Sequence, residues 1–400
     1  MRLRALLALT WIGAACSEQS AVPAAPVADE TAVDFEALRS LGYVDFAESG
    51  AEPWTGPGVE PGVETGLVHA TPDPERGYTL VVSIPHCTAD LVGPEGEIAR
   101  SWRATDAERW FRAKLSIDGD LVVIGRERER SPETDFLACY DWDGDLRWRA
   151  SAPVHHDFDW SPAGEIVALG KEVRTVAGEP VEDNPLLFFS PEGELLRSLS
   201  LLDVLVQHPE VYELPRFRPS ANVQGAEIFH ANSICWMDQP QLEGEGDWWR
   251  PTNVALSIRN QNLVVIVDTE TRELVWSWGP GELELQHEAT FLANGNLLLF
   301  DNGALTRDYS RLLQVDPRTD SVVWEYTATP PQRFFSSGRG TTEAIPGGGV
   351  LTANSNSGEV FELDGQGEVV WAWINPHGGE SRGVVRAHRY PRARVESWSE

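Results

Sequence analysis

A repeated phrase is the feature that most limits how this chain can fold. In each copy a turn rich in Gly, Asp or Glu leads into a short apolar strand that often ends in Trp. The fifth position of the phrase falls on Arg100, Trp148, Arg197, Trp276, Trp324 and Trp371. Successive copies lie 48, 49, 79, 48 and 47 residues apart, and a period of about 45 to 50 residues built from short strands is typical of β-propellers. The repeat therefore predicts an all-β fold, a six-bladed β-propeller with four-stranded blades.

The single long interval locates an insertion. It exceeds one repeat of 48 residues by 31, so extra chain lies between the third and fourth blade repeats. We place this insertion at about 200–228 and 237–252. The propeller itself is expected to span residues 66–390, with a C-terminal tail at 391–400.

The first blade is short by one strand. Either residues 66–71 or residues 384–390 could supply it. We favour the C-terminal segment, because closure of the ring by the two chain ends removes open sheet edges.

The beginning of the chain has the pattern of an export signal. Arg2 and Arg4 precede an apolar run that is too short to span a bilayer, and small residues follow up to Cys16. This pattern resembles a bacterial lipoprotein signal, in which the cysteine is lipidated, and ordinary signal cleavage is the alternative. We therefore expect a targeting segment at 1–16, a tether and N-terminal extension at 17–65, and a protein that is periplasmic or is a lipid-anchored protein facing the periplasm.

Charge and cysteine content limit the partners. The 62 acidic and 32 basic residues give a net charge of −30, which excludes nucleic acid as a partner because phosphate backbones require clustered cations. An anionic small molecule can bind only where local cations line a pocket. Cys87, Cys139 and Cys235 allow one disulfide, and we consider a bridge between Cys87 and Cys139. No cysteine pair has zinc-ligand spacing, so we predict no metal and no cofactor.

Three histidines share a position in successive blades. His156 and His287 each lie eight residues before a glycine, Gly164 and Gly295, that leads into an apolar strand, and His230 opens the fourth blade between them. Innermost strands of a propeller line its central channel. The three imidazoles are therefore expected to converge near one end of the channel.

The residue types around these histidines favour anion chemistry. Arg259 follows in the next strand of the fourth blade and can reach the same space, whereas His155 should face into the blade, since strand neighbours alternate sides. Arginine presents a planar cationic fork to an oxyanion, and a neutral histidine can attack as a nucleophile. The set suits transfer of a group with three charged oxygens. A zinc site of three histidines is the rival, but the guanidinium would repel a dication.

Several ordered motifs resemble one family. They are HHDFDW at 155–160, FHANS at 229–233, SIRNQN at 257–262 and QHEATFLANGNLLLFDNG at 286–303. Together they resemble the bacterial arylsulfate sulfotransferases, six-bladed propellers of the periplasm, over about residues 66–390. The resemblance implies PAPS-independent transfer of a sulfuryl group from an aryl sulfate ester to a phenol by a ping-pong mechanism.

The resemblance also implies roles for residues. His287 would be the nucleophile that is transiently sulfated. His156, His230 and Arg259 would hold the sulfuryl oxygens, with one of the two histidines acting as acid or base.

Four further residues are weaker candidates for contact with the substrate. Asn232 and Asn302 would orient their neighbours, and Trp248 and Trp249 in the insertion would stack on an aryl ring or pack at the surface. The alternative to an enzyme is a non-catalytic propeller that binds an anionic or aromatic ligand, or a protein, through the same channel.

Overall fold

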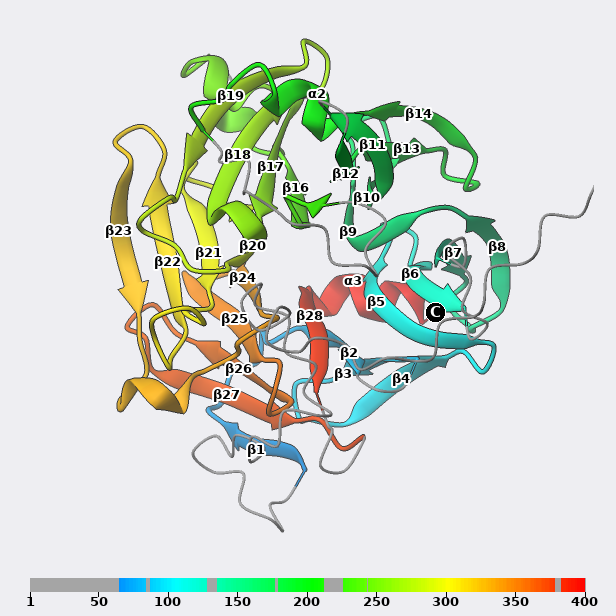
Figure 1. The fold of residues 1–400 in the computed structure, drawn as a ribbon. Helices are drawn as coiled ribbons and strands as arrows, with labels where there is room; N and C mark the ends of the chain where they lie inside the picture. The colour runs from blue at the N-terminus through cyan, green and yellow to red at the C-terminus, as the bar shows by residue number, and fades with distance from the viewer. Residues whose placement is uncertain are drawn as a thin grey trace, which may run out of the picture.

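Six antiparallel sheets surround a central axis in the computed structural model (Figure 1). The structure describes residues 65–83, 87–127, 135–176, 179–211, 226–242, 244–377 and 383–399. The arrangement confirms the predicted six-bladed β-propeller. The predicted targeting segment, the lipid anchor at Cys16 and nearly all of the tether lie outside the described residues, so export and anchoring stay predictions.

Each blade is a meander whose strands run from the axis outward. The first blade contains β28 (Val384–Tyr390), β2 (Tyr78–Ser83), β3 (Thr88–Val92) and β4 (Ile98–Arg103), and the second β5 (Ala107–Leu115), β6 (Leu121–Glu127), β7 (Asp135–Tyr140) and β8 (Leu146–Ser151). The third contains β9 (Val154–Trp160), β10 (Ile166–Gly170), β13 (Leu186–Phe189) and β14 (Leu195–Leu199), and the fourth β16 (Ala231–Trp236), β17 (Asn253–Ile258), β18 (Leu263–Asp268) and β19 (Glu273–Trp278). The fifth contains β20 (His287–Phe291), β21 (Leu297–Asp301), β22 (Arg311–Asp316) and β23 (Ser321–Tyr326), and the sixth β24 (Thr341–Ile345), β25 (Gly349–Asn354), β26 (Glu359–Leu363) and β27 (Val369–Ile374).

The two chain ends close the ring as expected. Strand β28 pairs antiparallel with β2, so the C-terminal segment supplies the innermost strand of the first blade. Strand β1 (Gly66–Ala70) instead pairs with β27 and forms a fifth, outermost strand of the sixth blade. The predicted C-terminal tail contains a helix, α3 (Arg392–Trp398), whose Val395 packs into the cluster between the first two blades.

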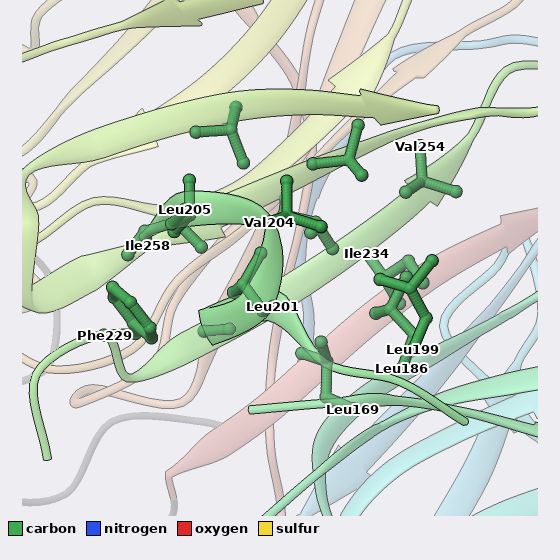
Figure 2. Packing of buried hydrophobic residues seen from close by; sticks show 14 of the residues in the cluster. Leu169, Leu186, Leu199, Leu201, Val204, Leu205, Phe229, Ile234, Val254 and Ile258 are labelled. Carbon is green, nitrogen blue, oxygen red and sulfur yellow. The ribbon is translucent and has the colours of Figure 1, made fainter. Parts of the chain in front are cut away.

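The insertions contain more regular structure than the sequence suggested. In the first of them, α2 (Leu201–Leu205) begins at Ser200, whose side chain accepts a hydrogen bond from the backbone N–H of Asp203. Figure 2 shows Leu201, Val204 and Leu205 of this helix in the apolar cluster between the third and fourth blades. The second insertion contains the short helices η1 (Pro240–Leu242) and η2 (Asp247–Trp249); η3 (Arg259–Gln261) and η4 (Pro331–Arg333) occur in loops of the propeller.

One added sheet was not predicted. Strands β11 (Glu172–Val176) and β12 (Glu179–Asp183) form a hairpin between the second and third strands of the third blade. Strand β15 (Ala226–Glu227), which precedes β16, pairs with β12 in the parallel direction. This three-stranded sheet lies outside the propeller repeat.

The core lies between adjacent blades rather than at the axis. Middle strands such as β18, with the sequence LVVIVD, are buried along their whole length because neighbouring sheets cover both faces. Tryptophans near the ends of the repeats join one blade to the next. The indole N–H of Trp102 donates to the Asp141 carbonyl at 3.0 Å, and that of Trp276 donates to Asp320 Oδ1 at 2.9 Å.

The disulfide considered between Cys87 and Cys139 is wrong. Cys87 contributes to the cluster between the first and second blades, whereas Cys139 contributes to the cluster between the second and third. The second blade therefore separates the two side chains, and no disulfide joins them. None of the helices in the described segments is long and apolar enough to cross a membrane.

Candidate active site

Irregular innermost strands present the histidines to the channel. In β20 the pairing register shifts between His287 and Ala289, and similar shifts occur in β9 and β16. The backbone is left-handed at His156, His230 and Glu288, with φ of 56°, 51° and 46°. Left-handed conformations are costly for residues other than glycine, and bulges re-aim the side chains next to them. The same unusual geometry at one end of three successive blades indicates a built site.

The structure brings the predicted residues together. The ring centroids of His156 and His230 lie 4.6 Å apart, in an edge-to-face arrangement. Arg259 is buried and is the first residue of η3, one residue beyond the strand in which the sequence placed it. Its backbone N–H donates to the carbonyl of His230 at 3.2 Å. His287 is buried as well, and its pKa is lowered first by that burial and then by the charges of Arg386 and Arg259 nearby.

Hydrogen bonds fix the tautomer of His287. Its Nδ1 lies 2.7 Å from Oδ1 of Asn302 and 3.1 Å from the carbonyl of Leu285. The Asn302 amide is oriented unambiguously, because its Nδ2 donates to the carbonyls of Ser336 and Arg339. Both neighbours of Nδ1 are therefore acceptors, so Nδ1 carries the proton. A neutral His287 consequently has its lone pair on Nε2.

A second chain of contacts fixes His156. Nε2 of the buried His155 lies 2.9 Å from the carbonyl of Gly170, which can only accept, so this nitrogen carries the proton; the contact from Asn184 Nδ2 is longer, at 3.4 Å. Nδ1 of His155 is then an acceptor, and it lies 2.5 Å from Nδ1 of His156. His156 therefore carries its proton on Nδ1 and its lone pair on Nε2. His155 reaches into the blade, as expected, but it also contacts the site.

Burial disfavours the charged form of these imidazoles. The pKa of His287 lies well below the ordinary histidine value because burial disfavours the charged ring and because Arg386 and Arg259 add positive charge nearby. Burial likewise lowers the pKa of His155, His156 and His230, although Glu227 partly opposes the shift at His230. Neutral imidazoles are the form in which histidine can act as a nucleophile or a base.

A layer of ion pairs adjoins the histidines, and sequence reasoning missed it. Arg112 lies 2.8 Å from Asp157 and 2.9 Å from Glu288, and Nε of Arg386 lies 3.2 Å from the other oxygen of Glu288. Lys114 completes the set at 3.6 Å from Asp157. The sequence contained one signal for this layer, because an acidic residue, Asp157 or Glu288, directly follows the histidine in both repeat motifs. The other members come from innermost strands that carry no histidine at the shared position.

Glu227 is a second residue that the sequence did not reveal. Its Oε1 lies 2.7 Å from Nδ1 of His230. It belongs to the short strand β15 of the added sheet, so no repeat alignment could place it. Among the described residues, no other carboxylate hydrogen-bonds to any of the three channel histidines.

The other candidates divide between the site and the core. Asn232 is buried and donates through Nδ2 to the carbonyl of Gln286 at 3.0 Å, which ties it to the residue before His287. Trp248 packs edge-to-face on Trp276, with ring centroids 6.2 Å apart.

Trp249 lies in the same interblade cluster as Trp248. Its ring packs on Phe291 and against Gly295 in the turn that follows β20. This turn is at the opposite end of β20 from His287. The two rings therefore pack in the core between the fourth and fifth blades, and the stacking on an aryl ring considered for them stays a prediction.

The described residues contain no group of three His, Cys, Asp or Glu side chains placed to hold a metal ion. What they define is a class of protein: a six-bladed β-propeller with a cluster of buried histidines beside Arg259 at one end of its channel. Residues 139–376 match the family model described as arylsulfotransferase (ASST), which is more than half of the chain. The chain belongs to this family. The family in general transfers the sulfuryl group from aryl sulfate donors to phenol acceptors.

Comparisons with other proteins add the fold alone. A protein of unknown function from Bacteroides caccae is 14% identical, with a TM-score of 0.51 over 78% of this chain and 98% of that one. Virginiamycin B lyase from Staphylococcus aureus is 12% identical, with a TM-score of 0.44 over 79% of this chain and 90% of that one. Among curated proteins, none matches this chain.

Proposed function

We propose that the protein is a PAPS-independent aryl sulfotransferase that works by a ping-pong mechanism through a sulfated His287. Family membership supports the general activity. The observation that carries the proposed mechanism is the fixed tautomer of His287, whose Nδ1–H is held by Asn302. A buried neutral imidazole with its lone pair on Nε2 is a competent nucleophile toward sulfur.

In the first half-reaction Nε2 of His287 attacks the sulfur of the aryl sulfate. The N–S bond forms as the bond between sulfur and the aryl oxygen breaks, and the leaving phenolate takes a proton from the site. The ring keeps its Nδ1–H and becomes a cationic N-sulfonated imidazolium. Its positive charge offsets the negative charge of the sulfuryl oxygens, so no net charge is added to the buried ring.

In the second half-reaction a phenol acceptor loses its proton to the site and its oxygen attacks the same sulfur. The N–S bond breaks, and its electron pair returns to Nε2 of His287. Charge on the transferring group is greatest in the transition state, where fixed cations are most effective. Arg259 supplies a permanent cation, and His230 lies beside it to contact the sulfuryl oxygens, whereas Nε2 of His156 carries a lone pair and cannot donate to them.

The test is mass spectrometry of protein quenched during reaction with 4-nitrophenyl sulfate in the absence of acceptor. The proposal predicts a sulfuryl adduct on the peptide that contains His287, which disappears when a phenol is added. His287→Asn should abolish both the adduct and turnover, whereas the control His69→Asn, at an exposed position in β1, should change neither. An active His287→Asn enzyme contradicts the proposal. A wild-type protein that binds the donor without an adduct is the non-catalytic propeller instead.

A further inference from the structure

The added sheet places two acidic residues opposite each other, and one of them contacts a channel histidine. Strand β15 pairs with β12 so that Glu227 lies directly opposite Glu182. Glu227 in turn contacts Nδ1 of His230 at 2.7 Å, and both side chains are largely buried. The three residues thus form a continuous line from the channel into a sheet that the propeller repeat does not contain.

The reaction proposed above requires a group that moves protons. One proton must reach the leaving phenolate, and one must leave the phenol acceptor. His287 cannot perform this task, because its nitrogens are committed to Asn302 and to sulfur. His156 is linked through His155 to the carbonyl of Gly170, which cannot take up a proton. His230 faces a carboxylate, which can.

The two carboxyl groups disfavour each other's ionisation. Adjacent buried carboxylates cannot both ionise without a large penalty. The pKa of Glu182 is raised, mainly by burial and also by the neighbouring Glu227, while Lys171 at 3.9 Å opposes the shift. The charges of Arg259 and Lys171 both act on His230. The pair formed by Glu182 and Glu227 therefore contains two acidic groups and has cations near it.

We propose that Glu182, Glu227 and His230 form a proton relay that serves both half-reactions, an inference that rests on the proposed function. When the donor binds, Glu227 is protonated and donates to Nδ1 of His230, whose Nε2 carries hydrogen. As the S–O bond breaks, Nε2–H passes to the phenolate oxygen and the Glu227 proton passes to Nδ1. The acceptor phenol then returns its proton to Nε2, and Nδ1–H returns to Glu227. Glu182 shares the carboxyl proton, so His230 never needs to remain charged.

Leaving-group dependence tests this relay. Glu227→Gln keeps an oxygen that can accept from Nδ1–H of His230 but removes the group that takes up the proton. Single-turnover release of phenol should fall about 100-fold or more with phenyl sulfate, a poor leaving group, since general acid catalysis typically contributes about 10²–10⁴-fold. With 4-nitrophenyl sulfate, which leaves without help, the rate should change less than about threefold. Glu182→Gln should act in the same direction with a smaller effect.

Controls separate the relay from structure and from the proposed function. Glu172→Gln, at an exposed position of β11 in the same sheet, should leave the single-turnover rates with both donors unchanged. Equal slowing of the two donors by Glu227→Gln, or no slowing of either, overturns the relay. If that variant does not fold, Glu182→Gln decides, and the absence of donor selectivity overturns the relay. If wild-type protein forms the His287 adduct but the variants give these negative results, the relay alone is refuted. If wild-type protein forms no adduct, the proposed function is refuted and the relay with it.

Discussion

Two neighbouring layers of the channel handle burial in opposite ways. His156 and His287 belong to the first layer, and the residues that directly follow them, Asp157 and Glu288, belong to the second. Burial penalises charge in both. Burial disfavours charge in the histidine layer and depresses the pKa of each imidazole, whereas the carboxylates of the second layer pair with Arg112 and Arg386.

This difference teaches which layer can react. A carboxylate fixed between guanidinium groups is stabilised in one state and has little reason to change it. A neutral imidazole has an available lone pair and can accept a new bond without first losing a partner. The paired layer therefore holds the geometry of the innermost strands, and the neutral layer carries the chemistry. The following predictions would break or sharpen this division.

The largest effect is expected on turnover from the histidine layer. His287→Asn should lower kcat by about 10⁴-fold or more, because the nucleophile is lost. The same change should lower the free energy of unfolding by about 1–3 kcal/mol, because it leaves the buried acceptor on Asn302 without its donor. Steady-state rates and urea unfolding measure the two quantities. A large loss of stability would place His287 among the structural residues instead.

The opposite pattern is expected in the ion-pair layer. Asp157→Asn leaves Arg112 and Lys114 without their shared buried carboxylate and should cost about 3–5 kcal/mol of unfolding free energy. Asp143→Asn, which removes an exposed partner of Arg100, is the matched control and should cost less than about 1 kcal/mol. Equal costs in the two variants would show that the buried pairs do not hold the fold.

Loss of the hydrogen bond that orients His287 should lower kcat less than loss of His287 itself. Asn302→Ala removes the acceptor of Nδ1–H and should lower kcat about 100-fold, which is about 2.7 kcal/mol. Steady-state kinetics should show the loss in kcat rather than in KM. Asn356→Ala, which loses only a contact to Ser337, is the control and should have normal kinetics. A change confined to KM would mean that Asn302 binds substrate rather than orienting the nucleophile.

The smallest effect is on the pH dependence of stability. Folded His156 and His287 have depressed pKa values, so below the ordinary histidine value of about 6.5 the unfolded chain binds more protons and stability falls as the pH falls. Each such histidine contributes at most about 1.4 kcal/mol per pH unit. His156→Gln should therefore lose less stability between pH 7.5 and 5.5 than the wild type. The exposed control His69→Gln should lose as much as the wild type, and identical slopes in all three proteins would contradict neutral burial.

The repeat explains why so much could be predicted. Its period determines the number of blades, and ring closure by β28 follows from the cost of an open sheet edge. The shared position of His156 and His287 likewise predicts their convergence, because equivalent positions on innermost strands meet at one end of the channel. These inferences depend on geometry that every blade repeats.

What the sequence could not reveal depends on features that do not repeat. The hairpin of β11 and β12 occurs in one blade only. Glu227 reaches His230 because its strand, β15, pairs with β12 of this hairpin. The face to which Trp249 or Cys139 points also depends on strand register, which a one-residue shift reverses. The ion pairs of Arg112 were missed because its innermost strand carries no histidine at the shared position, so the histidine alignment did not include it.

Long-range proton–nitrogen NMR of the protein with ¹⁵N-labelled histidine is the most direct test of the central claim. At pH 7 the ring of His287, assigned by its loss in His287→Asn, should show a protonated Nδ1 and an unprotonated Nε2. His156 should show the same neutral tautomer. An imidazolium at His287, or a neutral ring with its proton on Nε2, would contradict the account, because Nε2 would then have no lone pair for attack on sulfur.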